Sequence, residues 1–83
     1  MYELIIAPQA TTELKKLKQT HKLSLKAAFE EIKENPFLGK PLTKEFLGKY
    51  SYRVGLYRII YTFNEHDKII TILSAAQRSI AYK

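Results

Sequence analysis

The chain has 83 residues, of which 46% are hydrophobic and 27% charged, a balance typical of a globular domain and not of a disordered segment. It has no cysteine, which excludes disulfides and thiolate metal sites, and no apolar run approaches the roughly 18 residues of a membrane span. The net charge of +6 favours a polyanion or an acidic protein as partner. We therefore expect one domain, residues 1–83, in the cytoplasm and away from membranes.

The first part of the chain predicts a strand followed by a helix. Residues 2–7 (YELIIA) have the aromatic and β-branched content of a short strand, and Pro8 suits the first turn of a helix. One apolar stripe then recurs at helical spacing, formed by Ala10, Leu14 and Leu17, with lysines on the solvated side. We expect this helix to end near Thr20 and His21.

A second amphipathic helix is predicted to follow. Ser24 is a suitable N-cap, and the helix ends where proline follows Asn35, because the residue before a proline is pushed out of the α region. Its apolar stripe consists of Leu25, Ala28, Phe29 and Ile32. Two such helices form a helical hairpin whose apolar side must cover a sheet.

The next segment, residues 37–49, has two glycines, a proline and no clean period, so we interpret it as a connection. We expect Leu42, Phe46 and Leu47 to tie it to the edge of the core. Two strands separated by a turn come next, then a polar turn at residues 64–67 and a last strand at residues 69–75. The predicted order is β-α-α-β-β-β, an α+β domain with an antiparallel sheet covered by helices on one face.

Residues 50–63 (YSYRVGLYRIIYTF) carry the central prediction. With Gly55 and Leu56 as the two residues of a tight hairpin turn, Arg53 lies directly opposite Arg58. Two guanidinium groups facing each other across a ladder repel, and an anion between them would relieve the repulsion. Because the guanidinium fork matches phosphate oxygens, the hairpin indicates half of a phosphate-binding surface.

Alternation assigns the two faces of this hairpin. The apolar set Tyr57, Ile59, Tyr61 and Phe63 should face the helices, which leaves Arg58 on the uncovered face with Ile60 and Thr62. Arg78 follows the last strand, and a short tail could bring Tyr82 over the same face. The pattern alone leaves two readings open: unrelated surface charges, or one shared anion site.

Four motifs in order resemble the RelE/ParE superfamily of bacterial and archaeal toxin–antitoxin toxins over nearly the whole chain. They are A-x-x-x-L-x-x-L (10–17), N-P-x-x-G-x-x-L (35–42), Y-R-V-G-x-Y-R-I-I-Y (52–61) and R-x-x-x-Y (78–82). The resemblance implies a toxin encoded beside an acidic antitoxin. RelE-like members cut mRNA in the ribosomal A site, whereas ParE-like members inhibit DNA gyrase, and both functions remain alternatives here.

The resemblance also implies site residues. Catalytic roles map onto Arg53, Arg58, Arg78 and Tyr82, and RNA-binding roles onto Lys49, Ser51, Arg53 and Lys83. Some RelE members carry a lysine where this chain has Ser51, and the C-terminal histidine pair of other relatives is absent, since His21 and His66 are expected in turns.

The implied reaction is in-line attack of an RNA 2′-OH on the adjacent phosphate. Arginines stabilise the charge that develops on the phosphorane, but their pKa above about 12 makes them poor acids and bases. Tyr82 would stack on a base or take part in proton transfer, or else simply cover an apolar patch. No carboxylate pair, histidine cluster or glycine-rich phosphate loop occurs, so we expect neither a metal nor a cofactor.

Overall fold

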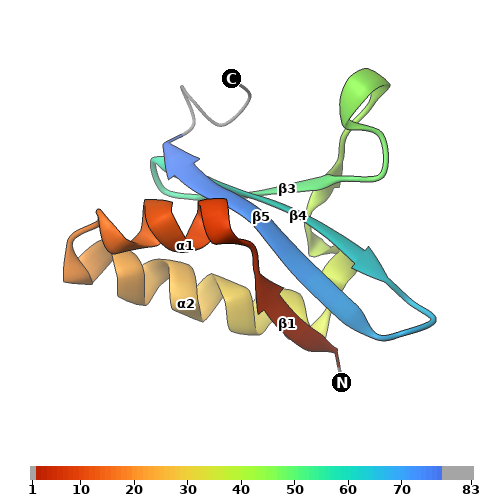
Figure 1. Cartoon of the computed structure of the whole chain (residues 1–83), viewed down its shortest axis with the longest axis horizontal. Coiled ribbons are helices and arrows are strands. Elements are labelled where there is room, and N and C mark those ends of the chain that lie inside the picture. The colour runs from red at the N-terminus through yellow and green to blue at the C-terminus, as the bar shows by residue number, and fades with distance from the viewer. Residues whose placement is uncertain (1, 78–83) are drawn as a thin grey trace.

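The computed structural model describes residues 2–77, so the predicted site residues Arg78, Tyr82 and Lys83 lie outside the described residues. Within the described range one sheet has the strand order β1-β5-β4-β3-β2, with both α-helices on one side of it (Figure 1). The elements are β1 (Glu3–Ile6), α1 (Pro8–Lys15), α2 (Gln19–Glu34), β2 (Lys40–Pro41), β3 (Tyr50–Val54), β4 (Tyr57–Asn64) and β5 (Ile69–Gln77), with 3-10 turns η1 (Pro36–Leu38) and η2 (Lys44–Phe46). The predicted α+β class and element order are confirmed, with β2 as an additional short strand.

The β3–β4 hairpin has the predicted register. Arg53 pairs with Arg58 and Val54 with Tyr57, so two residues form the turn. Gly55, the first of them, has a φ of 58°, which glycine adopts without the steric cost that a Cβ brings.

The edges of the sheet differ in direction. β1 pairs in parallel with β5, and the backbone N–H of Glu3 donates to the carbonyl of Lys68 at 2.8 Å. The β2–β3, β3–β4 and β4–β5 pairs are antiparallel, so the run from β2 to β5 is an antiparallel meander. The first strand of the chain therefore closes the sheet beside the last described one.

A β-bulge interrupts the β4–β5 ladder. Ile60 pairs with Ser74 but Tyr61 pairs with Ile72, which leaves Leu73 as the extra residue. A carboxylate from α1 binds the two residues that follow the extra one: Oε1 of Glu13 accepts the backbone N–H of Ala75 at 2.9 Å and the Ser74 hydroxyl at 3.0 Å. The bulge is thus held by the helix that packs over it.

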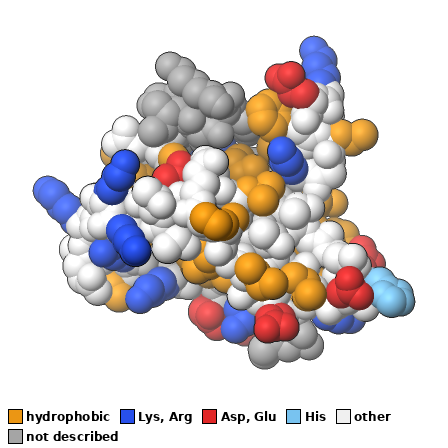
Figure 2. All heavy atoms as spheres, in the orientation of Figure 1, with side chains coloured by type: hydrophobic (Ala, Val, Ile, Leu, Met, Phe, Trp, Pro, Cys, Tyr) orange, Lys and Arg blue, Asp and Glu red, His pale blue; other side chains and the backbone are white. Residues whose placement is uncertain are grey.

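The core lies between the helices and one face of the sheet. Ile59 and Tyr61 are fully buried, as alternation predicted, whereas Tyr57 and Phe63 are half-buried at its margin. The remaining buried members are Ala10, Leu25, Ala28, Phe29, Ile32, Ile70, Ile72 and Ala75. Several lysine side chains lie exposed on the solvated side of the helical hairpin, where Figure 2 shows them as separate blue groups.

The predicted boundary between the helices was wrong. α1 ends at Lys15 and α2 already begins at Gln19, so Ser24 is no N-cap; it lies inside α2, where its hydroxyl donates to the carbonyl of Thr20. No glycine or proline stands between Gln19 and Ser24, and the polar run continues as helix. His21 is accordingly helical, with its ring 5.1 Å from that of Tyr57.

The connecting segment also departs from expectation at one residue. Leu42 and Phe46 are half-buried as predicted, but Leu47 is 77% exposed. The backbone passes through positive φ at Lys44 and Gly48, so Leu47 lies in an irregular turn and not on a strand whose alternation would direct it inward. Among the described residues no helix is long and apolar enough to cross a membrane.

Candidate active site on the open face of the sheet

The open face, the side of β2–β5 turned away from the helices, carries the two paired arginines. Arg53 on β3 lies opposite Arg58 on β4, and Arg58 in turn lies opposite Ala76 on β5. Directly paired residues project to the same face with Cβ atoms about 4.5–5.5 Å apart. Ala76, like the Nε atom of Arg58, is buried.

A hollow of about 450 Å³ lies beside the two arginines. Its lining consists of Leu38, Lys40, Leu42, Ser51, Tyr52, Arg53 and Arg58. Three of these residues are cationic, and none of the described residues that line it is acidic. Such a hollow suits an anion, because the potentials of the three cations add together and raise the local concentration of anions.

The two guanidinium groups sit in different surroundings. Arg53 is exposed, whereas Arg58 is half-buried and its Nε atom is buried. Electrostatic interactions strengthen where water is excluded, so a phosphate oxygen at Arg58 would gain more than one at Arg53.

A buried phenol fixes the rim of the hollow. The Tyr61 hydroxyl donates to the Pro36 carbonyl at 2.7 Å and accepts the Gly39 N–H at 2.8 Å. A Cβ on Gly39 would lie 2.5 Å from that hydroxyl oxygen, so only glycine fits there. Burial raises the pKa of Tyr61 above its ordinary value of 10.0, against a smaller lowering by the Gly39 N–H. The neutral phenol therefore anchors η1 and the start of β2.

Tyr52 lines the hollow without offering it a proton donor. Its hydroxyl donates to Oε1 of Glu31 on α2 at 3.2 Å. Burial, followed by the nearby Glu31 charge, raises the pKa of Tyr52. Among the described residues, the cationic lining of the hollow suits the binding of an anion, and the Tyr52 hydroxyl is engaged elsewhere.

The predicted RNA-binding residues divide into two groups. Ser51 lies on the open face, opposite Ile60 on one side and Lys40 on the other. Lys49 is half-buried outside the hollow, with its Nζ 5.6 Å from the centre of the Phe46 ring.

Sequence reasoning missed Lys40. It lies on a two-residue strand inside a segment without periodicity, and only its pairing with Ser51 brings it to the open face. The one local signal is its position next to Gly39, in the N-P-x-x-G motif.

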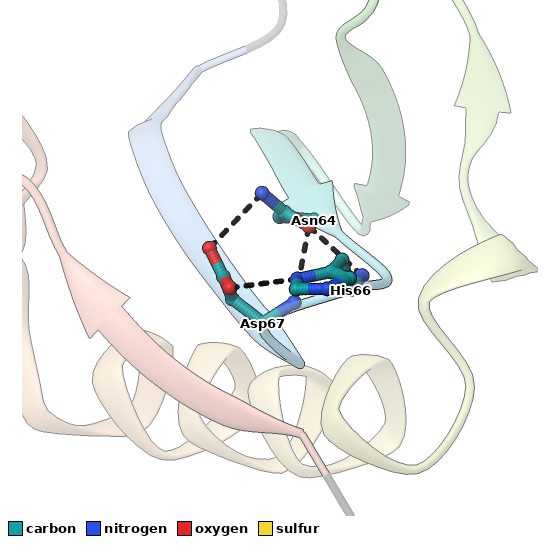
Figure 3. Close-up of polar contacts among 3 residues, drawn as sticks. All are labelled: Asn64, His66 and Asp67. Carbon is teal, nitrogen blue, oxygen red and sulfur yellow. Dashed lines mark hydrogen bonds and ion pairs between the residues drawn. The ribbon is translucent and has the colours of Figure 1, made fainter.

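The second histidine lies in the β4–β5 turn, as predicted. The Asn64 side-chain oxygen accepts the N–H groups of His66 and Asp67, at 2.9 and 3.1 Å, and the His66 ring meets the Asp67 carboxylate (Figure 3). This turn is six residues along β4 from Arg58, about 20 Å in an extended strand. Within residues 2–77 no group of three or more His, Asp or Glu side chains could hold a metal ion.

Comparison with known proteins identifies the family of this chain. The family described as ParE toxin of type II toxin-antitoxin system, parDE, matches residues 4–82. The toxin RelE of Mycobacterium tuberculosis is 30% identical over 84 residues, covering 99% of this chain and 87% of that protein. The toxin RelG of the same organism is 33% identical over 57 residues, covering 68% of this chain and 66% of RelG.

Solved structures share the fold. The RelBE2 toxin–antitoxin complex of M. tuberculosis matches with a TM-score of 0.84 at 29% identity, over 93% of this chain and 98% of that chain. The isolated E. coli RelE toxin matches with a TM-score of 0.80 at 24% identity, over 99% of this chain and 92% of that one. The protein therefore belongs to the ParE toxin family of type II toxin–antitoxin systems, within the RelE/ParE superfamily.

Proposed function

We propose that this toxin is a ribosome-dependent endoribonuclease that cuts mRNA by attack of a 2′-OH on the adjacent phosphate. The observation that carries the proposal is the Arg53–Arg58 pair beside a hollow lined by cations and by no described acid. A nuclease needs such a site, because the attacked phosphorus gathers negative charge in the transition state.

The two arginines take different parts. Arg58, half-buried, stabilises the developing charge on the phosphorane, since its surroundings strengthen the interaction. Arg53, exposed, binds and aligns the same phosphate from the neighbouring strand. A phosphate group bound by both arginines offsets the repulsion between their two positive charges.

The rest of the predicted machinery is proposed from the family resemblance. Arg78 adds a third guanidinium, and Tyr82 stacks on a base beside the cut or moves a proton. Lys49, Ser51 and Lys83 are proposed RNA contacts, with Ser51 placed at the hollow and Lys49 outside it. Neither metal nor cofactor has a part in this chemistry.

We further propose an acidic antitoxin as partner. Several structural neighbours are toxin–antitoxin complexes by their titles, among them RelBE2 of M. tuberculosis and the archaeal RelE–RelB complex of Pyrococcus horikoshii. A domain of net charge +6 with a cationic open face suits an acidic segment.

Primer extension on cellular mRNA after induction tests the proposal. Wild-type toxin should produce breaks within translated regions, and Arg58→Ala should remove both the breaks and the growth arrest. Lys26→Ala, which removes an exposed cation on α2, serves as the matched control and should behave as wild type.

Intact mRNA in growth-arrested cells would contradict the proposed nuclease function. If gyrase-linked DNA breaks accompanied it, the function would be that of the ParE-like members.

A further inference from the structure

We propose that Lys40 is a third RNA-binding cation of this site and holds a phosphate next to the one bound by Arg53 and Arg58. The inference rests on the proposed function and assigns a role to β2, which that function does not use.

The register places Lys40 on the open face. Lys40 pairs with Ser51, and directly paired residues project to the same side of a sheet. Arg53 is two residues beyond Ser51 on β3 and therefore shares that side. Lys40 and Arg53 are thus diagonal neighbours, a relation in which Cα atoms lie about 7–8 Å apart.

The surroundings leave the Lys40 ammonium available to an anion. Lys40 is exposed, lines the hollow with Arg53 and Arg58, and makes no ion pair with any other residue in the range 2–77. Its cross-strand partner Ser51 is small, so the four-carbon lysine stem can lie across it toward the arginines. The lysine ammonium is a compact charge on a flexible stem and lacks the rigid fork of arginine. It is therefore better suited to binding a phosphate than to stabilising one transition-state geometry.

The backbone that carries Lys40 is held in place. The N–H of the preceding residue, Gly39, donates to the buried Tyr61 hydroxyl, which also binds the Pro36 carbonyl. A charge fixed beforehand loses less entropy when the ligand binds. Tyr61 and Gly39 are positioning residues for Lys40 in this arrangement.

The first experiment measures cleavage of ribosome-bound mRNA by purified toxin. Lys40→Gln should lower kcat/KM about tenfold, mainly through KM, as loss of one charged contact to substrate does. Lys40→Arg should retain most of the activity, and Lys26→Gln on α2 should match wild type. All four proteins should melt at the same temperature, since both lysines are exposed.

The second experiment moves the charge across the ladder. Because residues 40 and 51 are paired, Lys40→Gln combined with Ser51→Lys should restore KM to within a few-fold of wild type. The charge-matched control adds a lysine on α2, away from the hollow. Lys40→Gln combined with Leu23→Lys has the same net charge and should stay impaired.

The outcomes separate the two claims. Wild-type toxin that leaves ribosome-bound mRNA intact overturns the proposed function and this inference with it. Wild-type toxin that cuts, with Lys40→Gln cutting as fast, overturns this inference alone. Rescue of Lys40→Gln by Leu23→Lys as complete as that by Ser51→Lys also overturns it, because the charge would then not act at the hollow.

Discussion

The two faces of β4 show how differently neighbouring residues of one strand can be used. On the covered face Ile59 and Tyr61 are fully buried, and the Tyr61 hydroxyl both donates and accepts a hydrogen bond. On the open face Arg58 lies opposite another arginine at the edge of a hollow. The open face is not wholly uncovered, contrary to the prediction from alternation, because Ile60, two residues from Arg58, is only 5% exposed. Both sides of the strand therefore bury apolar surface, but only the open side also keeps an unfavourable pair that can bind an anion.

Removing a charge from the open face should separate activity from stability most clearly. Arg58→Ala should lower kcat on ribosome-bound mRNA about 10²–10³-fold, as loss of one charge-stabilising donor does in other enzymes. Single-turnover cleavage assays measure this loss, and thermal melts should show a folded protein. A variant that unfolds, or one that cuts at the wild-type rate, would contradict the division between the two faces.

On the covered face, the largest loss of stability is expected at Gly39. Gly39→Ala places a Cβ 2.5 Å from the Tyr61 hydroxyl and 2.9 Å from a ring carbon, and the buried ring has no room to move. We expect the free energy of unfolding to fall by about 1–3 kcal/mol, the usual cost of overpacking. Urea denaturation measures it. The matched control is Gly48→Ala, whose Cβ would meet nothing within 4 Å and whose cost would come only from its positive φ.

Removing the phenol tests the same anchor without a clash. Tyr61→Phe leaves the Gly39 N–H without its acceptor and the Pro36 carbonyl without its donor, which should cost about 1–3 kcal/mol at pH 7. Chemical denaturation beside the Gly39→Ala variant measures the loss, and no change in the unfolding midpoint would contradict the anchor.

The contribution of Tyr61 to the free energy of unfolding should decrease at alkaline pH. Because the folded-state pKa is raised above 10.0, its favourable contribution is complete below pH 10. Above pH 10 the unfolded-state phenol ionises first, so stability falls as pH rises toward the folded-state pKa. Melting curves from pH 8 to 11 should show this fall, and Tyr61→Phe should reduce its slope. Tyr52 shifts in the same direction, so some slope should remain.

The bulge gives a smaller test on the covered side. Glu13→Ala leaves the Ala75 N–H and the Ser74 hydroxyl without their acceptor, and should cost about 1–2 kcal/mol. Glu13→Gln keeps a carbonyl oxygen for Ala75 and should lose less. Thermal melts compare the two variants, and equal melting temperatures for Glu13→Ala and wild type would show that the carboxylate does not hold the bulge.

The smallest expected effect is a gain. Arg53→Thr removes one of two like charges across the ladder and should raise stability by about 0.2–1 kcal/mol while weakening cleavage. The gain should shrink in high salt, where the repulsion is screened. Melting temperatures at low and high salt measure it, and a loss of stability at both would mean that the pairing of the arginines is not repulsive.

The parts of the site that the sequence predicted are local. The Arg53–Arg58 register follows from a two-residue turn with glycine first, and the faces of β4 follow from alternation. Both depend on residues within a few positions of each other.

The parts that it did not predict depend on distant residues. The pairing of Lys40 with Ser51 depends on how an aperiodic segment folds back. The Tyr61 anchor joins residues 25 and 22 positions apart, and the bulge depends on Glu13, 61 and 62 positions away. The prediction of the boundary between the helices failed for a different reason: the polar run there has no glycine or proline to mark where one helix ends and the next begins.

The parallel pairing of β1 with β5 also affects how the protein is made. Translation produces β1 first, yet its partner strand begins only at Ile69. At about 5–20 residues per second, several seconds separate the two strands on the ribosome. A nascent chain that stops before Ile69 has neither the partner of β1 nor the neighbour that completes the ladder of β4. The order of synthesis thus delays the assembled sheet, and with it the pairing of Arg58 with β5, until late in translation.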